Sequence, residues 1–202
     1  MTTTNTTVKT SFKKNDVVDL LTTMNAQRTA EHASFIEKAN ADQVSTDERK
    51  ELLASAKKAA THAKYIARMT DNETLLDAVA SQVVQLKIKA VQIEEIERDA
   101  YSLRKFAELM ISFAQKRKVS DEHSFSEALA VIASGVTDSD AVSFGKKMTN
   151  KEGGAYGARQ AQMSLKLLER LNACTVKQDG RNKLFCMNQD SAVFKRIMSA
   201  YE

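Results

Sequence analysis

No proline interrupts this sequence of 202 residues, and glycine occurs only six times. Proline lacks an amide donor and clashes with the preceding helical turn, and average usage would place roughly ten prolines in a chain of this length. Hydrophobic residues make up 43% of the chain, which suffices for a packed core in one domain or in two small ones. The sequence therefore predicts a mainly α-helical protein.

One segment breaks the helical pattern, and it centres on Asp179-Gly180. A two-residue hairpin turn of type I′ needs positive φ at both central positions, which Asp tolerates and Gly adopts freely. Residues 174–187 are therefore predicted to form a β-hairpin, which must pack on neighbouring helices because a lone hairpin is only marginally stable. The flanks supply the β-branched and apolar residues that strands favour: Thr175, Val176, Leu184, Phe185 and Met187.

Helix signals surround the predicted hairpin. Capping-box sequences open two short helices, one from Ser124 and one from Thr137. A longer helix is expected over residues 155–173, and a last one over about 190–201. The predicted order is helix, helix, long helix, hairpin and helix.

This order resembles the winged helix-turn-helix superfamily over about residues 124–187. The resemblance implies that residues 122–202 form a winged-helix domain, whose third helix enters the major groove of double-stranded DNA and whose hairpin is the wing. It also implies a sequence-specific DNA-binding protein that acts as a dimer, such as a transcriptional regulator or a replication or partition factor.

The third helix of this winged-helix plan is predicted to be amphipathic. Steps of 100° per residue place Gln162, Lys166 and Arg170 within about 60° of Arg159, opposite an apolar arc. Arg can pair bidentately with guanine, and Gln with adenine. The resemblance then assigns DNA contact to helix residues and wing residues: Tyr156, Arg159, Gln160, Gln162, Lys166 and Arg170 on the helix, and Lys177, Arg181 and Lys183 on the wing.

Positive charge is concentrated in the same region. Residues 157–202 carry eight Lys or Arg against four Asp or Glu, and the resulting formal charge of +4 (8 − 4) equals that of the whole chain. This placement favours nucleic-acid contact. The alternative is an ordinary solvated face, because winged helices also serve as protein-docking modules. The chain would then be a helical adaptor or inhibitor that docks other proteins.

The N-terminal half divides into a flexible polar arm, residues 1–14, and a helical region, residues 15–118. Apolar residues at helical spacing predict a first helix that ends near Asn40. Capping boxes at Ser45 and Thr70 open two further helices.

The last of these helices is expected to be long, because no Pro or Gly occurs between residues 72 and 118. Apolar residues recur there in a heptad pattern, with one extra three-residue step from Ile93 to Ile96. If continuous, it would span about 70 Å at roughly 1.5 Å per residue, too much to bury its stripe in one small domain. The alternative is a three-helix bundle with this seam as core. We expect a coiled-coil homodimer whose seam includes six residues: Val83, Leu86, Ile93, Ile96, Leu103 and Met110.

Signatures of catalysis, metals and membranes are missing from the sequence. No Walker loop or G-x-S-x-G motif occurs, and His32, His62 and His123 lack ligand spacing. No apolar run approaches the roughly 18 residues of a spanning helix, and the Thr-rich start lacks the core of a signal peptide. Cys174 and Cys186 are expected to be reduced. We therefore expect a cytoplasmic, non-enzymatic protein without cofactor or metal, whose partners are double-stranded DNA and a second copy of itself.

Overall fold

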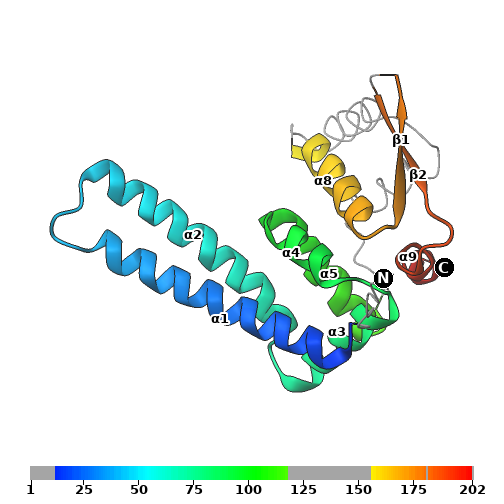
Figure 1. Cartoon of the computed structure of the whole chain (residues 1–202), viewed down its shortest axis with the longest axis horizontal. Helices are drawn as coiled ribbons and strands as arrows, with labels where there is room; N and C mark the ends of the chain where they lie inside the picture. Colours follow the sequence, from blue (N-terminus) through cyan, green and yellow to red (C-terminus); the bar gives the residue numbers. More distant parts are fainter. Residues whose placement is uncertain (1–11, 118–155, 181, 202) are drawn as a thin grey trace, which may run out of the picture.

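The computed structural model describes residues 12–117, 156–180 and 182–201. Within these ranges the chain forms seven helices and one two-stranded antiparallel sheet. Two long helices project as an arm, three shorter helices lie at its base, and a helix–hairpin–helix unit packs beyond them (Figure 1). The prediction of a mainly helical protein with a single hairpin is confirmed for the described ranges.

The arm consists of α1 (Lys14–Ala39) and α2 (Thr46–Met69), which run antiparallel (Figure 1). The Ser45 side chain begins α2 by accepting a hydrogen bond from an amide of the first turn at 3.3 Å, as the capping box predicts. The inner face of α2 carries small buried residues, which let the two helices approach closely: Ala56 and Ala59.

The continuous helix predicted over residues 72–118 is wrong, because the chain turns twice within it. Lys87 adopts a left-handed conformation with φ of 57°, and the Ile88 amide donates to the Val83 carbonyl at 3.0 Å, which closes the first helix. Asp99 begins the last helix by accepting from a first-turn amide at 3.0 Å. The segment therefore holds three helices: α3 (Glu73–Gln85), α4 (Ala90–Glu97) and α5 (Ala100–Ala114).

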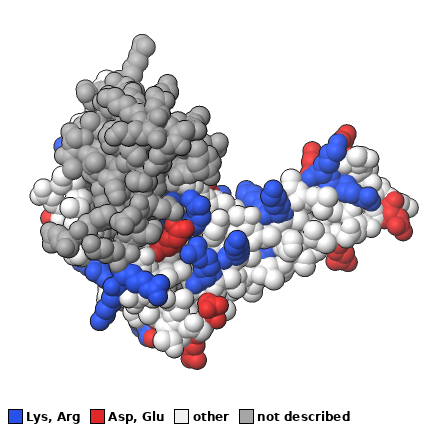
Figure 2. Space-filling view, turned by 180° about the vertical axis from the view of Figure 1, so that it is seen from behind, with Lys and Arg blue, Asp and Glu red and all other residues white. Residues whose placement is uncertain are grey.

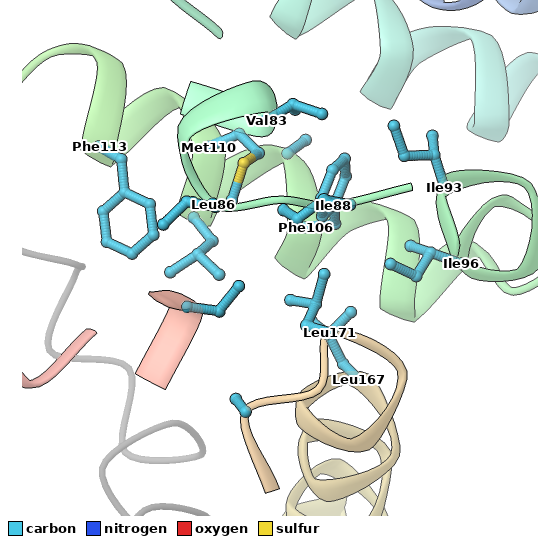
Figure 3. Packing of buried hydrophobic residues seen from close by; sticks show 14 of the residues in the cluster. Val83, Leu86, Ile88, Ile93, Ile96, Phe106, Met110, Phe113, Leu167 and Leu171 are labelled. Carbon is cyan, nitrogen blue, oxygen red and sulfur yellow. The ribbon is translucent and has the colours of Figure 1, made fainter. Parts of the chain in front are cut away.

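The residues predicted to form a dimer seam lie inside a single chain. The two turns fold α3, α4 and α5 back on one another, so their apolar faces cover each other and the end of the arm (Figure 3). The homodimer inferred from this seam loses its basis, and the alternative of a bundle core fits the packing. All six seam side chains are between 0% and 7% exposed: Val83, Leu86, Ile93, Ile96, Leu103 and Met110.

The predicted hairpin is confirmed as β1 (Cys174–Asp179) and β2 (Asn182–Met187). The register pairs Asp179 with Asn182, so the turn lies between them, one residue later than the predicted centre. Gly180 has φ of +57°, a conformation that glycine adopts without steric cost. The cysteines occupy opposite faces of the ribbon, because Cys174 pairs with Met187 and Cys186 with Thr175. Both cysteines are free.

The C-terminal unit comprises α8 (Tyr156–Arg170), the hairpin and α9 (Ala192–Tyr201), and it shares its core with the helices at the base of the arm. Figure 3 shows Leu167 and Leu171 directed toward Phe106 and Ile96. One hydrophobic cluster thus crosses the predicted boundary between residues 118 and 122. The two helices predicted from Ser124 and Thr137 fall outside the described residues, so the complete winged-helix plan stays a prediction.

Candidate nucleic-acid interface

The predicted two-faced character of α8 is visible wherever its side chains are described, from Met163 onward. Lys166 is exposed on the opposite side of the helix from the apolar face. Packing of that face on α4 and α5 fixes the orientation of α8 relative to the rest of the molecule. The buried face includes Ser164, Leu165, Leu167 and Leu168.

Four residues predicted to read bases belong to the first half of α8: Tyr156, Arg159, Gln160 and Gln162. The structure places them on the helix, as the sequence predicts, but their side chains fall outside the described set. Their contact with DNA stays a prediction.

Arg170 differs from Lys166, although both belong to the predicted basic stripe. Its guanidinium is half-buried and donates to the Ser102 hydroxyl of α5 at 3.2 Å. Its backbone carbonyl accepts a hydrogen bond from the Gln92 amide of α4. Arg170 therefore helps to position α8 on α4 and α5. Its predicted contact with DNA stays a prediction.

The predicted wing residues are spread around the tip of the hairpin. Lys177 is exposed on β1. The register pairs position 177 with Leu184 and Gln178 with Lys183, which assigns positions 177 and 183 to opposite faces of the ribbon. Arg181 lies outside the described residues. The register therefore does not place the two predicted wing positions on one face of the hairpin.

Burial makes Cys174 an unreactive part of this unit. Its side chain is 2% exposed and lies 4.0 Å from the Leu165 carbonyl of α8. Loss of solvent, followed by the negative charge of Glu169, raises the pKa of the Cys174 thiol to about 12. The thiol stays protonated at neutral pH, which suits a packing role and not a nucleophile or metal ligand.

A polar cluster between α2, α5 and α8 joins the arm to the C-terminal unit. Lys105 of α5 has no exposed surface, and its ammonium lies 3.4 Å from the Glu108 carboxylate. Glu108 also pairs with Arg68 of α2 at 3.6 Å, and the Tyr101 hydroxyl is 3.5 Å from the Ser164 hydroxyl of α8. Burial lowers the pKa of Lys105 despite the nearby carboxylate.

Sequence reasoning missed a basic stripe on α2, because it summed charge over all residues before 157 and found no net charge there. The α2 stripe consists of Lys50, Lys57, Lys64 and Arg68, all exposed and separated by steps of seven, seven and four residues. No acidic residue occurs between Glu51 and Asp71. The heptad spacing of Lys50, Lys57 and Lys64 was the signal in the sequence that could have predicted this stripe. Figure 2 shows Lys and Arg gathered along the arm on the face seen from behind.

A groove of about 520 Å³ opens where three turns meet: the α3–α4 turn, the α8–β1 turn and the β2–α9 turn. Its charged rim mixes Lys87 and Lys89 with Glu95 and Asp190, so it has no preference for one sign of charge. In the described part of the chain, no three His, Cys, Asp or Glu side chains gather closely enough to hold a metal ion. No helix among the described residues is long and apolar enough to cross a membrane.

Comparison with known proteins does not narrow the function. No protein-family model matches the chain, and no curated protein or solved structure shows a significant match to it.

Proposed function

We propose that the chain binds double-stranded DNA through α8 and the β1–β2 hairpin, and that it acts by binding and not by catalysis. One observation carries the proposal: α8 is docked by its apolar face, presents Lys166 on the other face, and leads directly into a hairpin with exposed Lys177. A docked helix beside a basic hairpin is the arrangement that winged helices use on DNA.

The mechanism follows from this docking. The first half of α8 enters the major groove, where Arg159, Gln160 and Gln162 read base edges. Lys166 and Lys177 neutralise phosphates and fix the register of the protein on the duplex. Because Arg170 and the buried leucines already hold α8 in place, little conformational entropy is lost on binding.

The buried seam changes the expected stoichiometry. Two-fold proteins read palindromic sites, but the residues assigned to dimerisation are buried within one chain. The proposal therefore needs only one C-terminal unit per site, as a transcriptional regulator or a replication or partition factor would provide.

Binding to random duplexes of about 24 base pairs, measured by fluorescence anisotropy between about 50 and 200 mM salt, tests the proposal. The Lys166→Gln/Lys177→Gln variant should bind all sequences more weakly, with a salt slope lower by about 1.8, since each phosphate contact contributes roughly 0.9. Lys38→Gln/Lys87→Gln, which removes two exposed lysines elsewhere, is the matched control. Identical slopes for the two variants would refute the proposal.

An adaptor function is the second candidate, and the arm favours it. α1 and α2 extend beyond the shared core, where they offer a long surface that the other described helices and strands do not cover (Figure 1). Recovery of one protein partner in equal amount from nuclease-treated lysate, together with no duplex binding at about 50 mM salt, would favour the adaptor over the DNA-binding protein.

A further inference from the structure

The α2 stripe is a straight line of positive charge on an exposed helix face. At 100° per residue, Lys50, Lys57, Lys64 and Arg68 fall within about 40° of one another. Their 18 residue steps cover about 27 Å at roughly 1.5 Å per residue. The stripe therefore presents a line of four cations along most of α2.

Two of the four stripe cations have no ion pair among the described residues. Lys50 pairs with Asp47 at 3.2 Å and Arg68 pairs with Glu108 at 3.6 Å, at the two ends of the stripe. In the described ranges, neither Lys57 nor Lys64 has an ion-pair partner. Such end pairs contribute little in solvent, and the like charges of Lys64 and Arg68 at i,i+4 repel one another.

Lys50, Lys57 and Lys64 of the stripe have no part in packing α2 against its neighbours, whereas Arg68 contacts Glu108 of α5. The opposite face of the helix buries Ala59, Ile66 and Met69 against α1 and the base of the arm. Substituting the stripe residues therefore leaves the core intact. The exposed lysines at the middle of this line take no part in packing, which points to an external polyanion as their partner.

The chemistry of the surface favours nucleic acid over a lipid headgroup layer. A helix that lies in a membrane surface needs an exposed apolar face beside its cations. Among the described residues of α2, Leu53 is the one large hydrophobic side chain that is exposed, at 46%. A length of about 27 Å instead matches roughly eight base pairs of duplex, at about 3.4 Å per pair.

The stripe is also tied to the surface assigned above to DNA. Arg68, its last member, contacts Glu108 of α5, and α5 contacts Ser164 of α8 through Tyr101. Figure 2 shows Lys and Arg continuing from the arm toward the core. We infer that the α2 stripe binds the phosphate backbone of the same duplex, which extends the footprint beyond the C-terminal unit; this inference rests on the proposed function.

The test compares full-length Lys57→Gln/Lys64→Gln with the Lys38→Gln/Lys87→Gln control on short and long duplexes, of about 12 and 24 base pairs. We expect the stripe variant to lose roughly tenfold in affinity for the long duplex at about 100 mM salt, and less than about twofold for the short one. Both variants should keep the parental far-UV circular dichroism, because all four lysines are exposed.

Each alternative outcome is decisive. Equal affinities of the stripe variant and the control for the long duplex would overturn the inference and leave the proposed function standing. Loss of binding in the stripe variant alone, with Lys166→Gln/Lys177→Gln at the parental level, would keep the stripe and overturn the role of α8. Absence of duplex binding by the parent, with stripe-dependent binding to vesicles of anionic phospholipid, would overturn both this inference and the proposed function.

Discussion

Replacement of Glu97 by glutamine should separate the arm from the base of the molecule. Glu97 ends α4, its side chain is only 8% exposed, and its two oxygens accept from Arg28 of α1 at 2.5 and 2.8 Å. This bidentate pair fixes the arm, and hence the α2 stripe, relative to the helices that carry α8. Glutamine keeps the size of the side chain but turns one acceptor into a donor that faces the guanidinium.

The expected loss of stability depends on how deeply the Arg28–Glu97 pair is buried. Removal of one partner from a fully buried pair costs about 3–5 kcal/mol. The Arg28 side chain is 30% exposed and also contacts Glu31 at 2.5 Å, so water and a second carboxylate reduce the cost. We expect Glu97→Gln to lower the free energy of unfolding by about 2–3 kcal/mol and the Tm by about 5–10 °C.

Urea unfolding followed by circular dichroism measures this effect. Glu31→Gln is the matched control, because Glu31 binds the same guanidinium from within α1 and its side chain is 32% exposed. It should cost less than about 1 kcal/mol. A loss below about 0.5 kcal/mol for Glu97→Gln, equal to that of Glu31→Gln, would refute the view that this pair holds the arm.

Three further predictions concern the core and the C-terminal unit. Leu168→Ala should cost about 2–5 kcal/mol in urea unfolding and weaken duplex binding, because Leu168 is fully buried where α8 docks; an unchanged midpoint would contradict this docking. Iodoacetamide at about pH 8 should alkylate Cys186 roughly a thousandfold faster than Cys174 in the folded protein, because a thiol with a pKa of about 12 holds far less thiolate. Mass spectrometry of quenched samples measures the ratio of the two rates. Equal rates would place Cys174 in solvent. Because burial lowers the pKa of Lys105 from 10.5, the unfolded chain binds more protons than the folded one between the lowered pKa and 10.5, so stability rises with pH in that window. Lys105→Met should remove this rise in urea titrations, and a variant that retains it would assign the rise to other groups.

Local signals in the sequence predicted most local elements, although the Thr70 box is wrong because α3 begins after an Asn72 cap. The Ser45 capping box and the Asp179-Gly180 turn act through neighbouring residues only, so the helix start and the hairpin are both present, the turn one residue late. The two-faced pattern of α8 was equally readable, because burial follows helical periodicity.

The prediction of one long helix is wrong because neither turn that interrupts it contains a proline or a glycine. Lys87 takes the left-handed conformation that glycine usually supplies, and burial of the adjacent Leu86 and Ile88 compensates for the strain. The heptad pattern is the same whether its apolar side chains meet a second chain or fold back on their own. The extra three-residue step from Ile93 to Ile96 falls inside α4, between the two turns.

The candidate surface was predicted in part. The exposure of Lys166 and Lys177 agrees with the sequence analysis, but the partner of Arg170 does not follow from it, because Ser102 lies 68 residues away along the chain. The α2 stripe was missed because charge was summed over all residues before 157, where Asp and Glu cancel Lys and Arg. Recognition depends on the charge of one face, which needs the helix and its packing partner to be known.

Photo-crosslinking tests the central proposal most directly. A photoreactive phenylalanine analogue replaces Lys166 on α8, Lys177 on β1 or Lys38 on α1, and each protein is irradiated with a duplex of about 24 base pairs. The proposal predicts protein–DNA adducts from positions 166 and 177 and none from position 38. Adducts from position 38 alone, or none from positions 166 and 177 when the duplex is bound, would contradict it.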